Sequence, residues 1–273
     1  MEGTPFFDAV DLGTASYEAV LAAQRRLVAL RARDRDAPDR LLLVEHPPTI
    51  TLGRRRTSGD NVVAAGDTPV VQVERGGDVT WHGPGQLVGY PIFALREGPE
   101  RDLHGVLRRL EDALIAVLRD GVGLDADRRP GFTGVWCRGR KLVSIGVAVS
   151  QWVTFHGFAL NVDPDLAEFQ RINPCGLEAG VMGSIRSLGA RVPARAELIA
   201  AIVAAVGDAF ERAPRQRLVA RPEDLAPDEV VTATPAGLDP TAAAQPWSER
   251  AGAAEGASSA TRGLGAGGHG GAQ

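Results

Sequence analysis

The stretch RGGDVTWHGPGQLVGY, residues 75–90, holds the densest gathering of glycine and polar side chains in the sequence. Glycine at this density lets the backbone approach a ligand closely and leaves N–H groups free to hold an oxygen. The stretch contains neither a GxxxxGK(S/T) pattern nor a GxGxxG between a strand and a helix, so it does not indicate a nucleotide phosphate loop. Because Arg75, Thr80, His82 and Gln86 fall within it, we interpret it as a ligand site in preference to a plain tight turn.

Outward from this stretch, groups of short β-rich runs lie between a few amphipathic segments. Apolar residues recur at helical spacing in three segments, residues 17–28, 103–118 and 198–210, which predicts three helices. Strands are predicted at residues 41–44, 49–52, 70–73, 88–93, 142–149 and 153–162. The strands are grouped and do not strictly alternate with helices, so we expect an α/β protein of the α+β type, with a mixed, largely antiparallel sheet flanked by helices.

A hairpin is predicted in the middle of the chain. Residues 135–137 and the run from Leu142 are both β-rich, and Gly139 lies in the turn between them. Lys141 would then begin the returning strand.

The C-terminal 42 residues differ in composition from the rest. From residue 232 onward, 31 of these 42 are Ala, Gly, Pro, Ser or Thr, a composition that cannot bury enough apolar surface to fold. We therefore expect one catalytic domain, residues 1–231, and a disordered Ala/Gly-rich tail, residues 232–273.

Charge and apolar content exclude several classes of protein. The chain has 34 acidic and 30 basic residues, a net charge of -4, which disfavours a nucleic-acid binder. It has neither an N-terminal leader in which a basic segment is followed by an apolar one nor an apolar run of about 18 residues. We therefore expect a cytoplasmic protein that does not bind a membrane. The two cysteines, Cys137 and Cys175, lie in no metal-binding pattern, and no metal or other cofactor is predicted.

Lys141 is the only lysine among the 30 basic residues. Arginine keeps its proton at all ordinary pH values, whereas a lysine amine can lose it in a suitable environment. In a sequence that uses arginine almost everywhere, the exception indicates proton chemistry at Lys141, the alternative being an accidental surface lysine.

Cys175 lies in the segment INPCGLEAGVMGS, between a proline and a glycine that leaves room beside the sulfur. A buried structural cysteine is the alternative, and Cys137, inside the predicted hairpin, fits that role better. To act as a nucleophile Cys175 needs a neighbour that stabilises its thiolate, and a lysine would serve. Residue spacing alone does not show whether Lys141 and Cys175 are close.

Two histidines and an arginine cluster remain open to more than one interpretation. His82 could be a general base, a donor to a carbonyl, or a loop anchor, and we favour a positioning role. His156, flanked by Phe155 and Phe158, is expected at the edge of an apolar pocket. Arg54, Arg55 and Arg56 form either a solvated turn or a docking surface for an acidic protein.

At these residues the chain resembles the lipoyl(octanoyl) transferases. Residues 75–90 meet that family's pattern RGGxxT(F/Y/W)HxxGQxxxY in full. The likeness continues through TLGRR at 51–55, GVWCRGRKLVSIGV at 134–147, HGFALNV at 156–162 and NPCG at 173–176. It spans nearly all of the predicted domain and excludes the tail.

The resemblance implies transfer of an octanoyl group from octanoyl-acyl carrier protein to a lysine of lipoyl domains, those of 2-oxo acid dehydrogenases and the H protein of the glycine cleavage system. It implies a fold like the catalytic domain of biotin and lipoate protein ligases, a thioester on Cys175, and a Lys141 that tunes this cysteine. It further implies a substrate site made of Arg75, Gly76, Gly77, Asp78, Val79, Thr80, Trp81, His82, Ser144, Ile145, Gly146, Gly157, Phe158 and Ala159.

The chemistry of that reaction sets further expectations. Backbone N–H groups of the Gly76–Gly77 turn, or near Gly176, would stabilise the oxyanion. Phe155, Phe158 and Ile145 would line an apolar channel for the eight-carbon chain. Because the conversion of a thioester to an amide lowers the free energy, no ATP is needed.

Two other functions compete with this one. The first is an ATP-dependent lipoate or biotin ligase on the same fold, which would need no cysteine. The second is an inactive module that binds acyl carrier protein or lipoyl domains and would need neither Lys141 nor Cys175.

Overall fold

The computed structural model describes residues 4–55, 57–173 and 179–225. Three α-helices are present in these ranges: α1 (Tyr17–Arg33), α2 (Leu103–Ala116), which continues into the π-helical segment η2 (Val117–Val122), and α3 (Arg195–Phe210). The strands are β1 (Phe6–Thr14), β2 (Asp39–Glu45), β3 (Thr49–Leu52), β4 (Val70–Gln72), β5 (Val79–His82), β6 (Gln86–Ile92), β7 (Asp127–Arg129), β8 (Phe132–Cys137), β9 (Arg140–Ser150), β10 (Val153–Asn161) and β11 (Ala213–Val219).

Eight of these strands form the main sheet, in the order β11-β1-β2-β6-β10-β9-β8-β7. β1 pairs in parallel with β11 and β2, and the remaining neighbours are antiparallel. The predicted mixed, largely antiparallel sheet is therefore confirmed.

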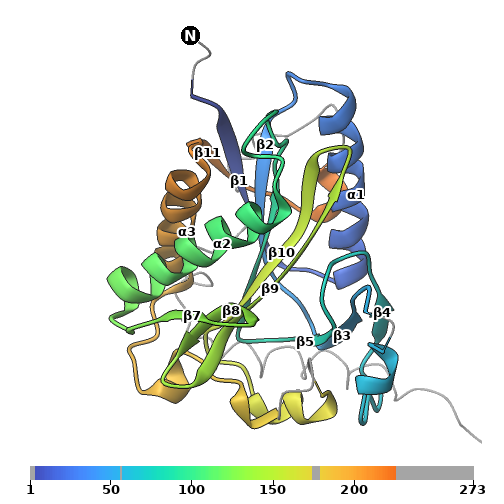
Figure 1. Cartoon of the computed structure of the whole chain (residues 1–273). Coiled ribbons are helices and arrows are strands. Elements are labelled where there is room, and N and C mark those ends of the chain that lie inside the picture. Colours follow the sequence, from blue (N-terminus) through green and yellow to red (C-terminus); the bar gives the residue numbers. More distant parts are fainter. Residues whose placement is uncertain (1–3, 56, 174–178, 226–273) are drawn as a thin grey trace, which may run out of the picture.

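Helices cover both faces of the main sheet (Figure 1). Alternating strand residues explain this layering, because Leu41 and Leu43 point into one apolar cluster whereas Leu42 and Val44 point into the other. The first cluster is completed by α2 and α3 and the second by α1. The sheet is thus buried on both faces, and each face supplies part of the site described below.

The helices begin where the sequence provides capping side chains. Ser16 accepts a hydrogen bond from the Ala19 N–H at the start of α1, and Asp102 accepts one from the His104 N–H at the start of α2. The three helices predicted from periodicity are confirmed, with α1 extending to Arg33.

A second, three-stranded sheet has the order β4-β3-β5 and packs beside the main one. Ile50, Val79, Trp81 and Phe169 form its own apolar cluster. Residues 75–90 therefore do not form a simple loop, because β5 belongs to the small sheet and β6 to the main sheet.

The predicted hairpin is confirmed as β8 and β9, joined by Arg138 and Gly139, both at positive φ as a tight two-residue turn requires. Lys141 is the second residue of β9. Strands β1, β5, β7 and β11 are not predicted from the sequence. The proposed end of the catalytic domain at residue 231 and the tail lie outside the described residues and stay predictions.

Candidate active site

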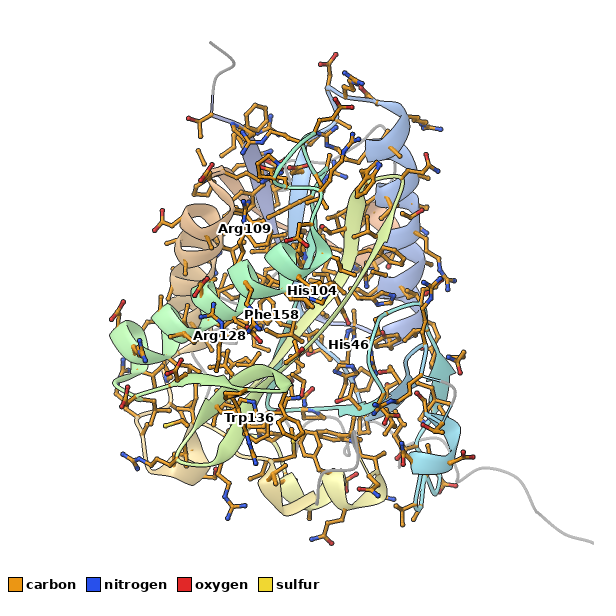
Figure 2. The ribbon with its side chains drawn as sticks, in the orientation of Figure 1. His46, His104, Arg109, Arg128, Trp136 and Phe158 are labelled. Atoms are coloured by element: carbon orange, nitrogen blue, oxygen red, sulfur yellow. The ribbon has the colours of Figure 1, made fainter. Side chains whose placement is uncertain are left out.

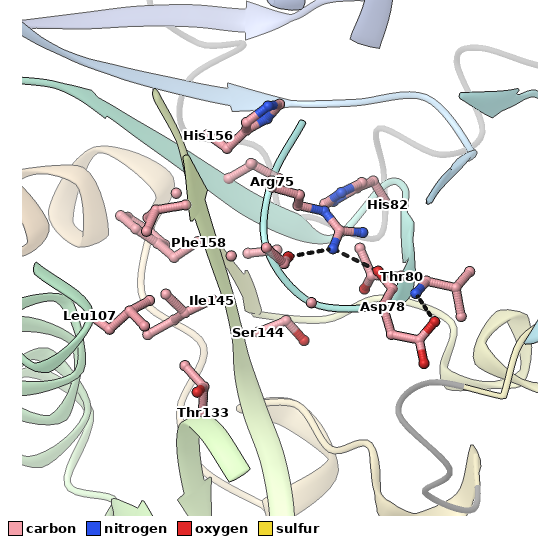
Figure 3. A pocket seen from close by; sticks show the side chains of 18 of the residues that line it. Arg75, Asp78, Thr80, His82, Leu107, Thr133, Ser144, Ile145, His156 and Phe158 are labelled. Carbon is pink, nitrogen blue, oxygen red and sulfur yellow. Dashed lines mark hydrogen bonds between the residues drawn. The ribbon is translucent and has the colours of Figure 1, made fainter. Parts of the chain in front are cut away.

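A cavity of about 670 Å³ lies between the main sheet, the small sheet and α2 (Figure 3). This volume is in the range of small-molecule sites. All of the predicted substrate residues except Trp81 line it, namely Arg75, Gly76, Gly77, Asp78, Val79, Thr80, His82, Ser144, Ile145, Gly146, Gly157, Phe158 and Ala159, and so does Lys141.

An open edge of the main sheet creates the room for this cavity. Pairing between β8 and β9 begins at the hairpin turn and ends at the pair of Val135 with Val143. Beyond that point β9 continues to Ser150, and the Gly76 N–H donates to the Val147 carbonyl on the same edge (3.0 Å). The β9 backbone between Val143 and Val147 therefore faces the cavity, where a substrate can reach it.

Arg75 builds the loop that faces this edge. Its guanidinium is buried and donates to the Asp78 carbonyl (2.7 Å) and to the carbonyl and hydroxyl oxygens of Thr51 (both 2.9 Å). These bonds tie the loop to β3. Arg75 thus shapes the wall of the cavity through its backbone partners.

Asp78 fixes the other end of that loop. Its carboxylate accepts hydrogen bonds from the Asn61 amide (2.8 Å) and the Val79 N–H (2.8 Å) and lies 3.5 Å from Arg55. Burial acts to raise the pKa of Asp78, but these hydrogen bonds outweigh it and hold the pKa below its usual value. The carboxylate is ionised at neutral pH and serves as a structural acceptor.

Two glycines let the loop and the neighbouring strands come close to β9 and β10. A Cβ on Gly146 would lie 3.1 Å from the Gly76 carbonyl oxygen, and one on Gly157 would lie 2.1 Å from the Gly89 carbonyl oxygen. Side chains at these positions would collide with the neighbouring backbone of the cavity wall. Gly146 and Gly157 of the predicted site are therefore explained by close approach of backbone.

His82 is held by neighbouring side chains. Its Nδ1 lies 3.2 Å from Gln86 Oε1, and its ring stacks on Tyr17 with centroids 5.5 Å apart. Burial lowers the pKa of His82 well below its ordinary value, and the nearby His46 and Arg75 lower it further. A neutral, weakly basic imidazole fits the positioning role that the sequence favoured.

Behind His82 a buried hydrogen-bond chain runs through His46. Its Nδ1 lies 2.8 Å from the Ala15 carbonyl and its Nε2 lies 2.8 Å from the Tyr90 hydroxyl. Because a carbonyl only accepts, Nδ1 carries the proton, and Nε2 accepts from Tyr90. Burial lowers the pKa of His46 to about 4. Figure 2 shows His46 on the α1 side of the molecule and Phe158 beneath α2.

Lys141 lies where β8 leaves space for it. Its Nζ is 5.8 Å from the centre of the Trp136 ring, and the Gly183 N–H donates to its carbonyl (3.0 Å). Gly134, on β8, adopts a φ of 125°, and its missing side chain makes room for the Lys141 aliphatic chain. The buried carboxylate of Glu111 accepts the Gly134 N–H (2.9 Å) and so fixes this part of β8.

His156 adopts a strained conformation in the middle of β10. Its φ is 56°, and its N–H donates to Gln24 Oε1 of α1 (2.8 Å). In a regular strand consecutive side chains point to opposite faces, yet the rings of Phe155 and His156 lie side by side with centroids 4.7 Å apart. The imidazole lines the cavity and lies 3.4 Å from Glu74.

Some predicted site residues are placed differently. Trp81 does not line the cavity and packs against Phe169 in the small-sheet cluster. Phe155 belongs to the α1 cluster, on the other face from Phe158 and Ile145, so its place in the predicted channel is wrong. Side chains three residues apart on a strand, such as those of Phe155 and Phe158, point to opposite faces of the sheet.

The predicted nucleophile lies outside the described residues. Cys175 and Gly176 both fall in the range 174–178, so the predicted Cys175–Lys141 pair stays a prediction. The Gly76 N–H is already donated to Val147, which leaves it no free N–H for an oxyanion. Cys137 is buried among apolar side chains, as expected of a structural cysteine.

Sequence reasoning missed several residues of the site. Leu107 and Phe132 line the apolar part of the cavity from α2 and β8. Glu111 could have been found, since it lies four residues after Leu107 and three before Leu114 and so shares the apolar face of that helix. A charged residue on such a face indicates a buried partner.

Within the described ranges, no three His, Cys, Asp or Glu side chains gather closely enough to hold a metal ion. Likewise, none of the helices found there has the length and apolarity needed to cross a lipid bilayer.

Comparison with known proteins identifies the class to which this fold and cavity belong. The chain is a member of the family described as the lipoyl protein ligase A/B catalytic domain, whose family model matches residues 16–207. A lipoate-protein ligase A bound with ATP has the same fold, with a TM-score of 0.63 and 14% identity over 81% of this chain and 92% of that one. A bipartite lipoate protein ligase from Thermoplasma acidophilum also has a TM-score of 0.63, with 17% identity over 81% and 90% of the two chains.

Proteins of similar sequence identify the family within this class. An octanoyltransferase of Gloeobacter violaceus is 51% identical over 66% of this chain and 79% of its own length. One of Geobacter metallireducens is 52% identical over 67% and 84%, and one of Geobacter sulfurreducens is 47% identical over 79% and 88%. The chain therefore belongs to the lipoyl(octanoyl) transferase family and is an acyltransferase.

Proposed function

We propose that the protein transfers an octanoyl group from octanoyl-acyl carrier protein to a specific lysine of lipoyl domains, through a thioester on Cys175. The acceptors are the lipoyl domains of 2-oxo acid dehydrogenases and the H protein of the glycine cleavage system, and the reaction takes place in the cytoplasm. The observation that carries the proposal is the 47–52% identity to octanoyltransferases over most of their length.

The cavity supports the proposal because it combines an apolar wall with one amine. Leu107, Ile145 and Phe158 supply the apolar wall, and burial of acyl carbons against such side chains contributes about 0.8 kcal/mol per methylene. Lys141 lines the same cavity. A site that binds an acyl chain beside a group able to exchange a proton suits acyl transfer.

In the first half-reaction Lys141 accepts the proton of the Cys175 thiol, and the ion pair favours the thiolate. The thiolate forms a bond to the carbonyl carbon of the octanoyl thioester, and the bond from that carbon to the carrier sulfur breaks. The carrier thiolate takes the proton back from Lys141 and leaves as a thiol.

In the second half-reaction the acceptor lysine amine forms a bond to the same carbonyl carbon, and the bond to Cys175 breaks. The surplus proton of the amine passes to Lys141 or to the departing Cys175 thiolate. The product is an amide and the enzyme returns to its starting state, so the steps balance without ATP or any cofactor.

The test is incubation of the purified protein with octanoyl-acyl carrier protein, followed by intact-mass spectrometry. We expect one added octanoyl group, absent in Cys175→Ser and released when an apo-lipoyl domain is added. Acylation of the lipoyl domain only with ATP and free octanoate would instead indicate a ligase. Binding of either protein without any acyl transfer would indicate an inactive binding module.

A further inference from the structure

One residue of β9 has backbone groups that strand pairing does not occupy. β8 pairs with β9 only as far as Val143, and the Gly76 N–H takes the Val147 carbonyl further along the same edge. Ile145 lies between these two points. Among the residues that the structure describes, no strand therefore pairs with Ile145 on this edge.

The β9–β10 hairpin determines where the backbone groups of Ile145 point. Ser150 and Val153 flank its two-residue turn, whose residues both have positive φ, and this type of turn closes on a hydrogen-bonded pair. Hydrogen-bonded positions alternate along an antiparallel pair, so the N–H and C=O of Ile145 both point away from β10. The bond from Gly76 to the Val147 carbonyl, two residues further on, agrees with this alternation.

A buried carboxylate holds β8 where its pairing with β9 ends. The Gly134 N–H, directly before the last paired residue of β8, donates to Glu111 Oε1 of α2 (2.9 Å). Glu111 is 1% exposed, so this bond is shielded from water. The opening beside Ile145 is thus bounded by a strand that is fixed to a helix.

The opening lies inside the cavity that contains Lys141. Thr133, Ile145 and Lys141 all line this cavity, and Ile145 is partly exposed. Figure 3 shows the Ile145 side chain on the Leu107 side of β9 and Ser144 on the other side. The side chain of Ile145 therefore belongs to the apolar wall, whereas its N–H and C=O lie in the plane of the sheet and can bind another part of the substrate.

The donor of the proposed function carries a group that fits this opening. A carrier protein presents its acyl chain as a thioester at the end of a phosphopantetheine arm, a thin chain that contains a β-alanine unit. This unit is the part of the arm that is built like an amino-acid residue, with its own N–H and C=O, and rotation about its central carbon–carbon bond can turn both to one side. An extended chain of this kind binds an open strand edge through main-chain hydrogen bonds. The opening is one residue long, which suits a narrow arm and not a strand of a folded domain.

We propose that the backbone of Ile145 binds the β-alanine unit of the donor arm as a short added strand. The Ile145 N–H donates to the carbonyl of the unit, and the Ile145 C=O accepts from its N–H. The inference rests on the proposed function and names the part of the donor that this edge recognises. The acyl chain then follows the apolar wall, and the arm follows the sheet edge.

The first test changes the arm and leaves the protein intact. The carrier protein is loaded with octanoyl-phosphopantetheine or with one of two analogues, in which an ester oxygen replaces either the β-alanine N–H or the amide N–H nearer the sulfur. We expect kcat/KM for octanoyl transfer to fall about tenfold with the first analogue, because the Ile145 C=O then faces an oxygen. With the second analogue we expect a fall of at most about threefold, because an ester carbonyl still accepts a hydrogen bond.

The second test changes the protein. Ile145→Pro removes the proposed donor without costing a strand hydrogen bond, and Ile145→Ala shortens the side chain but keeps the N–H. For each variant, kcat/KM is measured with the natural arm and with the first analogue on one preparation, so that loss of folded protein cancels in the ratio. We expect the ratio to stay near tenfold in the alanine variant and to fall below about threefold in the proline variant, because the arm is no longer held at the edge.

Every other result has a defined meaning. Equal transfer from all three donors, or an equal loss with both analogues, would overturn the inference and leave the proposed function standing. A ratio that is kept in both variants, or lost in both, would also contradict it, because the Ile145 N–H would then not be the group that holds the arm. Absence of octanoyl transfer from the natural donor by the wild-type protein would contradict the proposed function itself.

Discussion

A Cβ on Gly134 would lie 2.8 Å from Cε of Lys141 and 2.3 Å from the Val143 carbonyl oxygen. The space that the lysine side chain occupies therefore depends on the absence of a side chain on the neighbouring strand. The position of the only lysine in the chain is set by a glycine seven residues earlier in the sequence.

The first prediction follows from this contact. Gly134→Ala should displace Lys141, lower octanoyl transfer per folded molecule at least about tenfold, and destabilise the protein by roughly 1–3 kcal/mol through overpacking. Urea unfolding and initial rates measure the two effects. Gly59→Ala, where a Cβ would meet nothing within 4 Å, is the matched control and should change neither.

The second prediction concerns the proton chemistry of Lys141. Lys141→Arg keeps the positive charge but removes an amine that can cycle between two protonation states. We expect turnover to collapse, by about a hundredfold or more, as in Lys141→Met. The measurement is steady-state transfer together with the rate of thiol alkylation against pH. Full transfer by the arginine variant would show that charge alone suffices.

The third prediction concerns docking of the acidic carrier protein. Arg54 and Arg55 line the cavity, and Arg56 lies outside the described residues. Reversal of all three to Glu should slow the encounter with octanoyl-acyl carrier protein, more at low than at high salt. Reversal of the exposed Arg33, Arg35 and Arg217 is the control. An unchanged salt dependence of kcat/KM in the first variant would refute the prediction.

The fourth prediction is a loss of stability in acid. Burial lowers the pKa of His46 to about 4, so its contribution is complete above the ordinary value of 6.5 and is lost as the pH falls towards 4. Between pH 7 and pH 5 we expect a loss of about 2 kcal/mol from this residue, visible in urea midpoints. His46→Gln should reduce the pH dependence, whereas His104→Gln, an exposed site on α2, should leave it unchanged.

The fifth prediction concerns the C-terminal segment. A chain that ends at residue 231 should keep its melting temperature and its transfer rate, because the removed residues have no core-forming composition. Thermal melts and transfer assays of the two lengths decide this. A fall of more than a few degrees would show that the segment contributes to folding.

The helices and most of the buried strands were predictable because burial leaves a periodic pattern in the sequence, although the largely buried strands β1 and β5 were not predicted. α3 buries Leu198, Ile199, Ile202 and Val206 in register with its turns, and this spacing is visible in the sequence. β11 was not predictable, because it is a largely exposed edge strand with arginines at 215 and 217. Pairing with β1 makes it a strand, and that pairing is not encoded locally.

The candidate site likewise contains residues that were predictable from the sequence and residues that were not. The residues of the cavity loop were predictable from glycine density and family pattern, since both are local. The face of Phe155 was also predictable, since Phe155 lies three residues from Phe158 on the same strand. The conformation of His156 was not, because it depends on Gln24, more than a hundred residues earlier in the chain. The roles of Glu111 and Gly134 in placing Lys141 likewise appear only once α2 and β8 are packed together.

The short connection between β5 and β6 determines how the two sheets are placed relative to each other. Only residues 83–85 join the strand that belongs to the small sheet to the strand that belongs to the main sheet. At its two ends a Cβ on Gly83 would collide with the Trp81 ring, and one on Gly85 with the Asp163 backbone. Insertion or deletion of a single residue there would slide one wall of the acyl cavity past the other, so the length of this connection gauges the width of the cavity.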